Sequence, residues 1–215
     1  SASPSRVHTP HVPHSPPFVV CGHGFSLSQD NGRTMTTDTV GADTRYRTIV
    51  IDPPWMERGG GKSKRGADRH YQLLHTRDMP RVILRAPVWR PADDCILFMW
   101  ATANHLPGAL WLIESLGFRY VTNAVWVKPH AGLGQYFRMR HEHLLLATRG
   151  KGTQVRTAAK NIASVIEAPR GRHSQKPLTA FEMVERRSEG PYLEMFARSR
   201  RPGWDAWGDE VPEAA

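Results

Sequence analysis

The chain alternates short apolar runs of strand length with amphipathic stretches of helical period from Tyr46 onward. Strands are predicted at Tyr46–Asp52, Cys95–Trp100, Tyr120–Lys128, Glu142–Thr148, Ser164–Ala168 and Tyr192–Phe196, the last of which closes the sheet. Helices are predicted where Leu106, Ala109, Leu110, Ile113 and Leu116 share one face, with a stop at Gly117, and from Pro177 to Arg187, with the proline in the first turn. Because strands alternate with helices, we expect an α/β fold whose mostly parallel sheet is covered by helices on both faces.

Residues 1–43 differ from the rest of the chain, because they are rich in Ser, Pro, His, Thr and Gly and lack apolar periodicity. Such a composition cannot bury enough surface to offset the entropy that is lost when a chain becomes ordered. We therefore expect a flexible leader over residues 1–43 and a single domain over residues 44–215.

The chain carries no obvious targeting or membrane signal. No apolar run approaches the roughly 20 residues of a membrane helix, and the first residues lack the apolar stretch of a signal peptide. The two cysteines, Cys21 and Cys95, lie in unrelated contexts and imply no disulfide framework. These features predict a cytoplasmic protein that does not enter a membrane.

The charge balance favours a polyanionic partner. Lys and Arg number 29 against 20 Asp and Glu, which gives a formal net charge of +9. A surface of this kind attracts nucleic acid by counterion release before any specific contact forms. The alternative is a generally basic surface whose lysines and arginines only solvate the protein.

The tetrapeptide Asp52-Pro53-Pro54-Trp55 follows the first predicted strand and supplies an unusual set of groups. Asp52 can accept a hydrogen bond from an amino group, and the backbone carbonyl of Pro53 can accept a second. Trp55 can stack on an unstacked base. These four residues fit a site that holds a purine and directs its exocyclic amine at an activated methyl donor. The alternative is a strand that ends in a turn, with Asp52 as a cap and Trp55 in the core.

Further motifs follow in a fixed order along the chain. They are His70-Tyr71, Leu97–Thr102 (LFMWAT), Trp126-Val127-Lys128, His141–Leu144 (HEHL), His173–Pro177 (HSQKP), Glu194–Arg198 (EMFAR) and Arg201–Gly208 (RPGWDAWG). With the DPPW tetrapeptide, this set resembles the MT-A70 family of N6-adenine methyltransferases, in particular its bacterial and phage members. The resemblance implies a class I methyltransferase fold, which is Rossmann-like, with the catalytic strand placed before the cofactor strand in a permuted order. It also implies S-adenosylmethionine as the cofactor.

The resemblance assigns roles to individual residues. It places Asp52, Pro53, Pro54 and Trp55 in the catalytic motif, with Trp55 and Tyr71 on either side of the adenine. The cofactor contacts that it implies are Asp52, Lys176, Arg198, Asp209 and Glu210. The family often has Asn where this chain has Asp209, which puts that ribose contact in question.

Two other segments carry residues typical of binding sites. The first, residues 57–69, contains Lys62, Lys64, Arg65 and Arg69, which we expect to hold substrate phosphates, with a solvated linker as the alternative. The second, His141-Glu142-His143, lacks the second histidine of a zinc helix, because Leu145 stands in its place. We therefore predict packing or substrate contact there and no metal.

The combined prediction is a methyltransferase that acts on adenine in nucleic acid. DNA is favoured over RNA, because the domain resembles the compact bacterial and phage members of the family. A catalytically inactive binding subunit is the alternative of another class, although an intact DPPW motif argues against it. A homodimer or a methyltransferase-like partner subunit is compatible with the resemblance.

Overall fold

The computed structural model describes residues 36–37, 44–56, 73–132, 136–152, 155–171, 175–209 and 211. The strands are β1 (Thr36–Thr37), β2 (Tyr46–Ile51), β3 (Pro91–Ala101), β4 (Arg119–Val127), β5 (His141–Arg149), β6 (Val165–Glu167), β7 (Tyr192–Met195) and β8 (Trp204–Gly208). The α-helices are α1 (Met79–Arg85), α2 (Leu106–Ser115) and α3 (Leu178–Arg187). Two short 3-10 helices, η2 (Thr76–Asp78) and η3 (Ala103–His105), precede α1 and α2.

One sheet contains all eight of these strands, in the order β1-β8-β7-β2-β3-β5-β4-β6. Strands β8, β7, β2 and β3 pair in parallel. Strand β5 is antiparallel to both β3 and β4, so β4 runs in the same direction as β3, and β6 is parallel to β4. Only β5 and β1 therefore run against the others within the described sheet, which confirms the predicted mostly parallel arrangement.

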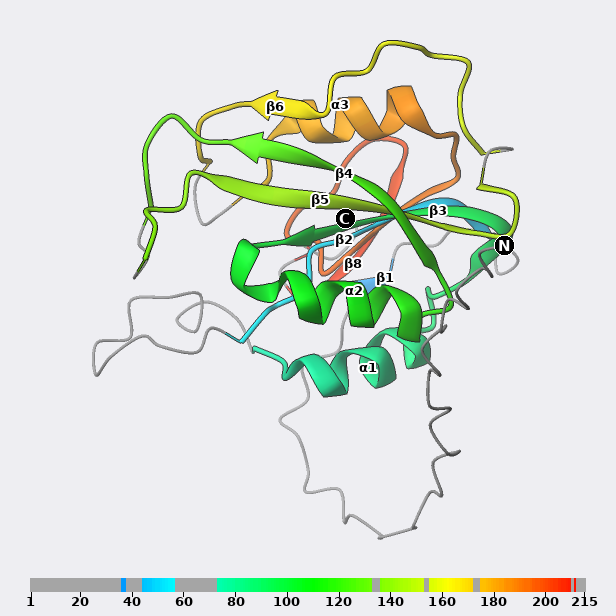
Figure 1. Ribbon diagram of the computed structural model, residues 1–215. Coiled ribbons are helices and arrows are strands. Elements are labelled where there is room, and N and C mark those ends of the chain that lie inside the picture. Colours follow the sequence, from blue (N-terminus) through cyan, green and yellow to red (C-terminus); the bar gives the residue numbers. More distant parts are fainter. Residues whose placement is uncertain are drawn as a thin grey trace, which may run out of the picture. The chain divides into compact units, whose positions relative to one another are not determined.

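Helices cover both faces of the sheet, as predicted (Figure 1). On one face, α1 and α2 pack through Met79, Ile83, Leu112 and Ile113 against apolar side chains of β2, β3 and β7. On the other face, Phe181 and the neighbouring apolar residues of α3 pack against alternate residues of the same strands. Because side chains alternate along a strand, each buried strand contributes to both layers of the core.

The structure corrects several sequence predictions. Strand β7 does not close the sheet, because β8 pairs beyond it and β1 pairs beyond β8. Helix α1 was not predicted, since its seven residues are too few for a clear helical period. Pro177 lies in extended conformation as the N-cap of α3 rather than inside its first turn. Within the predicted leader, the structure describes only β1, whose two residues pair with Trp207 and Gly208.

The topology gathers the chemically interesting segments at one edge of the sheet. The carboxyl ends of β2, β3, β4, β7 and β8 meet there, together with the first residues of antiparallel β5. Ligands of open α/β sheets bind at this edge. None of the helices that the structure describes is long and apolar enough to cross a membrane.

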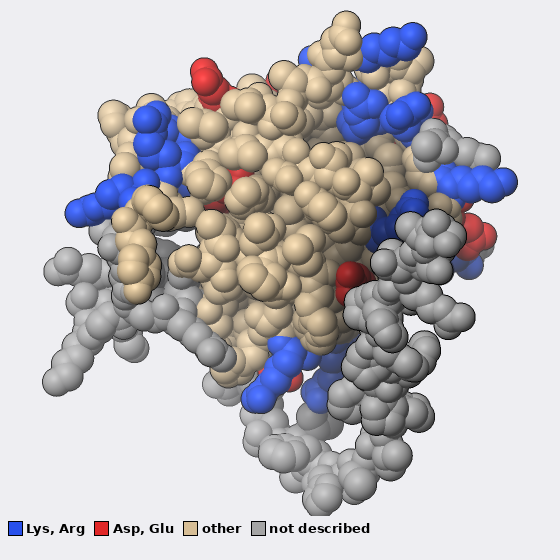
Figure 2. All heavy atoms as spheres, in the orientation of Figure 1, with Lys and Arg blue, Asp and Glu red and all other residues tan. Residues whose placement is uncertain are grey.

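Helix α1 presents a basic surface on its outer side. Arg81 and Arg85 are exposed there, while Met79 and Ile83 of the same helix are buried. Figure 2 shows Lys and Arg side chains at the lower part of the view, where Figure 1 places α1. This face therefore carries positive charge close to the DPPW motif, because Leu74, which lies just before η2, donates its N–H to the carbonyl of Pro54.

Gly117 ends α2 in the left-handed conformation, with φ of 79°. Its N–H donates to the carbonyl of Glu114 at 2.9 Å, and the N–H of Phe118 donates to the carbonyl of Ile113 at 3.1 Å. We predict that Gly117→Ala lowers the free energy of unfolding by about 1 kcal/mol, because a side chain disfavours this conformation. Urea unfolding measures the change, with the exposed Glu114→Ala of the same helix as a control. Equal stabilities of the two variants would contradict the assignment of Gly117 as the helix stop.

Candidate active site

Asp52 stands at the centre of the carboxyl edge. It follows the last residue of β2, a strand that lies between β7 and β3 in the middle of the sheet. Its N–H donates to the carbonyl of Met195 at 3.3 Å, and the next residue, Pro53, has no N–H to continue the ladder. The strand therefore ends at Asp52 and delivers its carboxylate to the edge where ligands bind.

The two proline carbonyls of the motif already accept hydrogen bonds within the protein. The carbonyl of Pro53 accepts the N–H of Trp55 at 2.8 Å, and that of Pro54 accepts the N–H of Leu74 at 3.0 Å. A carbonyl oxygen has two lone pairs. Pro53 therefore keeps the capacity for one further hydrogen bond, which is the one that the sequence analysis assigned to an amino group.

Trp55 packs more deeply than a simple stacking platform requires. Its side chain belongs to the core cluster that includes α1 and α2, and only 8% of the residue is exposed. The indole Nε1 donates to the carbonyl of Trp100 at 3.0 Å, and the ring stacks on His105 at 5.2 Å with an interplanar angle of 10°. One face of the indole is thus covered by His105, so a base can reach only what remains of the ring. The predicted contact with adenine stays a prediction.

Asp52 belongs to a cluster of four charged side chains. Lys176 Nζ lies 2.8 Å from Asp52 Oδ2 and 3.3 Å from Glu142 Oε2. The ammonium group of Lys128 donates a short hydrogen bond to the other carboxylate oxygen of Glu142. Two lysines and two carboxylates therefore form a continuous, mostly buried network across β2, β4, β5 and the segment before α3.

Aromatic rings border both lysines of this network. Lys176 Nζ lies 5.3 Å from the centre of the Trp100 ring, and Lys128 Nζ lies 4.6 Å from that of Trp126. Such contacts favour the charged form of a lysine. They also exclude water from one side of the network, which strengthens the ionic interactions inside it.

The pKa values of the network reflect a competition between burial and pairing. Burial alone would lower the pKa of Lys176, but the carboxylates of Asp52 and Glu142 raise it above its ordinary value. Burial alone would raise the pKa of Glu142, but Lys176 and Lys128 together bring it below its ordinary value. Burial wins at Lys128, whose pKa is lowered although Glu142 acts in the opposite direction. Lys176 and Glu142 are therefore held in their charged forms near neutral pH.

Glu194 adds a carboxyl group with different behaviour. It lies near the end of β7, 13% of its side chain is exposed, and Arg201 Nη2 lies 3.9 Å from its Oε2. Burial raises the pKa of Glu194 to about 7, because Arg201 offsets only part of the burial effect and the charge of Asp52 adds to it. Glu194 therefore changes its charge near neutral pH.

The ends of β7 and β8 approach each other closely. Phe196, which follows β7, has a φ of 58°, a left-handed conformation that is costly for a bulky residue and turns the chain sharply. The N–H of Ala197 donates to the carbonyl of Trp207 at 3.0 Å, and a Cβ on Gly208 would lie 2.2 Å from the carbonyl oxygen of Ala197. Only glycine fits at position 208. Arg198 follows Ala197 and Asp209 follows Gly208, so the backbones of Arg198 and Asp209 begin close together at this edge of the sheet.

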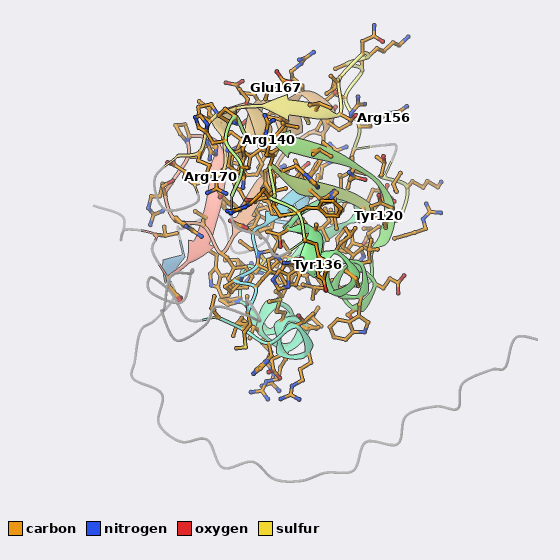
Figure 3. The ribbon with its side chains drawn as sticks, turned by 60° about the vertical axis from the view of Figure 1, so that its left-hand side comes forward. Tyr120, Tyr136, Arg140, Arg156, Glu167 and Arg170 are labelled. Atoms are coloured by element: carbon orange, nitrogen blue, oxygen red, sulfur yellow. The ribbon has the colours of Figure 1, made fainter. Side chains whose placement is uncertain are left out.

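The segment between β4 and β5 extends the site outward. A hydrogen bond joins the two ends of this segment, because Arg140 Nε donates to the carbonyl of Lys128 at 3.1 Å. Tyr136 and Phe137 project from it with 94% and 80% of their surfaces exposed. Arg140 and Arg170 lie in the same region of the molecule (Figure 3). Exposed aromatic rings and arginines thus border the edge that carries Asp52.

Comparison with known families agrees with these observations. The model of the MT-A70 family matches residues 46–210, from the first residue of β2 to just beyond β8. The chain belongs to the MT-A70 family. It is therefore a methyltransferase with the class I methyltransferase-like α/β fold, and the resemblance found in the sequence is confirmed.

Several characterised relatives align with most of the chain. It is 32% identical over 188 residues to the type II methyltransferase M.MunI from Mycoplasma sp, with 79% of each chain covered. It is 29% identical to human N(6)-adenine-specific methyltransferase METTL4 and 31% identical to N6-methyladenosine RNA methyltransferase MTA1 from Cryphonectria parasitica. These two matches cover 77% of this chain but only 37% of METTL4 and 52% of MTA1.

The structure brings together some of the residues that the MT-A70 resemblance singled out. Asp52 and Lys176 are in direct contact, and the charge of Arg198 acts on Lys176 and on Glu194. Asp209 is exposed at the end of β8. The remaining predicted residues, Lys62, Lys64, Arg65, Arg69, Tyr71 and Glu210, lie outside the described part of the chain.

Sequence reasoning missed the importance of Lys128, Glu142 and Glu194. Lys128 and Glu142 stand within the quoted MT-A70 motifs, but only packing or substrate contact was assigned to the HEH tripeptide. The available signal was the position of a charged residue at the end of an otherwise apolar strand. Within the described residues, no group of three or more His, Cys, Asp or Glu side chains is placed to hold a metal ion.

We predict that Glu194 makes the stability of this MT-A70 protein fall between acidic and neutral pH. A carboxyl whose pKa rises from 4.5 to about 7 on folding stabilises the fold below about pH 4.5, and that contribution is lost as the pH rises through 7. Glu194→Gln removes this loss, so the variant should gain on the order of 2 kcal/mol relative to the natural protein between about pH 5 and about pH 8. Urea unfolding at both pH values measures it. If the free energies of unfolding of the variant and the natural protein differ by the same amount at both pH values, the pKa of Glu194 is not raised on folding.

Proposed function

We propose that this methyltransferase transfers a methyl group from S-adenosylmethionine to the N6 amino group of adenine in nucleic acid, with DNA as the favoured substrate. The observation that carries the proposal is the carboxylate of Asp52, which is held at the centre of the carboxyl edge by the buried ammonium of Lys176. The family and the names of the relatives support methyl transfer to adenine.

The residues at this edge fit the charges of S-adenosylmethionine. Its carboxylate needs a cation, which Lys176 or Arg198 can supply, and its ammonium and sulfonium groups need anions, which Asp52 and Glu194 can supply. Asp209, at the end of β8, can accept hydrogen bonds from ribose hydroxyls. The MT-A70 resemblance implies a cofactor contact for Glu210 as well. When bound, the cofactor supplies an already activated methyl group, so no covalent nucleophile of the protein is required.

The direct contact between Asp52 and Lys176 restricts where the ligands can bind. No space separates these two side chains, so the transferred methyl group cannot lie between them. Only 17% of the Asp52 side chain is exposed. We infer that the adenine amine and the cofactor both approach Asp52 from this exposed side.

Asp52 would then act on the adenine amine directly. The lone pair of this nitrogen is delocalised into the purine ring, so the amine becomes nucleophilic only when its protons are held in a pyramidal arrangement. Asp52 accepts a hydrogen bond from one N–H of the amine, and the free lone pair of the Pro53 carbonyl accepts a hydrogen bond from the other N–H. After transfer, the nitrogen must lose a proton, and Asp52 is the base that lies next to it.

Surface features support nucleic acid as the substrate class. The exposed rings of Tyr136 and Phe137 provide stacking surfaces for bases, and arginines lie on the same segment. The net charge of +9 attracts phosphates. The lysines and arginines of residues 57–69 remain part of the proposal as phosphate contacts.

RNA is the alternative substrate, because MTA1, an RNA methyltransferase by name, is 31% identical to this chain. We favour DNA, because the match to M.MunI covers 79% of both chains, whereas that to MTA1 covers 52% of the relative. A catalytically inactive binding subunit is disfavoured by the intact carboxylate and lysine pair. Homodimer formation, a methyltransferase-like partner and a cytoplasmic location stay predictions.

We predict that Asp52→Ala lowers methyl transfer by at least about 100-fold while the fold and most of the cofactor affinity remain. The assay follows tritium from labelled S-adenosylmethionine into matched DNA and RNA oligonucleotides, followed by nucleoside analysis. Asp93→Ala, an exposed carboxylate near the opposite end of β3, is the matched control and should keep full activity.

The nucleoside analysis separates the alternatives. Tritium in N6-methyladenine from the DNA oligonucleotide would support DNA as the substrate. Tritium found only in the RNA oligonucleotide would show that the substrate is RNA. Comparable turnover by Asp52→Ala would refute the role of Asp52. No transfer to either polymer by a folded chain that binds the cofactor would favour the inactive binding subunit.

A further inference from the structure

A cavity of about 520 Å³ lies next to the DPPW motif, on its α1 and α2 side. Met56, the residue after the motif, forms part of its wall. The remaining described wall comes from η2 and its preceding residue, with His75 and Arg77, and from η3 and the start of α2, with Asn104 and His105. Its volume is within the range of roughly 300–1,000 Å³ that is usual for small-molecule sites.

His105 connects this cavity to the proposed adenine site. One face of its imidazole ring is stacked on Trp55, and the same residue lines the cavity. A flat ring that enters the cavity therefore meets an aromatic residue that is already stacked on the DPPW tryptophan. Aromatic side chains of this kind hold nucleic-acid bases by stacking, whatever their sequence.

The polar groups of the cavity match a nucleotide. Arg77 is exposed, with its Nε 3.8 Å from Asp78 Oδ2, so its guanidinium keeps donors for a phosphate. Asn104 and His75 also line the cavity and are exposed. An asparagine amide offers both a donor and an acceptor to the edge of a base.

A line of arginines leads away from the cavity. Arg77, Arg81 and Arg85 are spaced four residues apart along η2 and α1, which places them on the same side of the helix. All three are exposed. Figure 2 shows Lys and Arg side chains in the lower part of the view, where Figure 1 places α1. Because Arg77 lines the cavity, the row of arginines begins at the cavity wall and follows α1. A row of cations of this length is suited to successive phosphates of one strand.

We propose that the cavity binds the nucleotide adjacent to the target adenine, with its phosphate at Arg77, and that the strand continues over Arg81 and Arg85. The inference rests on the proposed function, because it assigns a second position on the same nucleic-acid substrate. It predicts that the enzyme senses the neighbouring base through the cavity and the backbone through α1.

The backbone contact is tested by the double variant Arg81→Gln/Arg85→Gln. The probe is a fluorescein-labelled DNA oligonucleotide of about 12 nucleotides that contains adenine, and its affinity is followed by anisotropy as salt is raised. We expect binding about tenfold weaker and a salt slope reduced by about 2, since two phosphate contacts are lost. Arg119→Gln, an exposed arginine at the start of β4, is the matched control and should bind like the natural protein. Equal behaviour of the double variant and the control would overturn the strand path.

The base contact is tested by methyl transfer to oligonucleotides in which the neighbour of the target adenine, on either side, is replaced by an abasic residue. For the natural protein, we expect kcat/KM to fall about tenfold on one of the two sides. Asn104→Ala should lose most of this discrimination, because its kcat/KM on the intact oligonucleotide falls to near the value on the abasic one. An equal loss in the natural protein and in Asn104→Ala, or no loss on either side, would refute the subsite. If no oligonucleotide is methylated, the proposed function fails, whereas the anisotropy experiment still decides whether the strand follows α1.

Discussion

The architecture of the site depends on a single buried cation, the ammonium group of Lys176, which lies between the carboxylates of Asp52 and Glu142. These residues come from the segment before α3, from the end of β2 and from the start of β5. A buried ion pair costs desolvation, and removing one partner leaves an uncompensated charge, so the three elements are fixed relative to one another. Lys128 completes the neutralisation of Glu142 from the end of β4. The carboxylate of Asp52 is consequently presented in one orientation.

That fixed orientation is what methyl transfer requires. Most of the barrier to methylating a weakly nucleophilic amine is lowered by positioning and by fixed charges, since the donor is already activated. The sheet supplies the positioning, because β2 lies at its centre and ends at two prolines. The packing of Trp55 against His105 and the carbonyl of Trp100 holds the other end of the motif in place. Rigid support therefore surrounds the one carboxylate that is proposed to touch the substrate.

Much of the sheet could be predicted from the sequence, because β2, β3 and β5 are continuous apolar runs and Gly117 marks the end of α2. Strand β8 was not predicted as a strand, since its five residues follow a Pro-Gly turn and carry no period-2 pattern long enough to distinguish them from a loop. The family resemblance placed Asp52 and Lys176 at the same site. Glu142 and Lys128 could not be placed next to them from the sequence, because that requires the register of β4 against β5. The sequence left open whether Trp55 is a stacking platform or a core residue, because the η3 segment that covers its ring is about 50 residues away along the chain.

The central claim is that the charges around Lys176 form a site for S-adenosylmethionine. Isothermal titration calorimetry of the folded chain tests it most directly, with the Lys176→Met variant alongside and circular dichroism to verify that both are folded. The account predicts one binding site in the natural protein and an affinity at least about tenfold weaker in the variant. A folded natural protein that takes up no cofactor, or a folded variant that binds it equally well, would contradict the account.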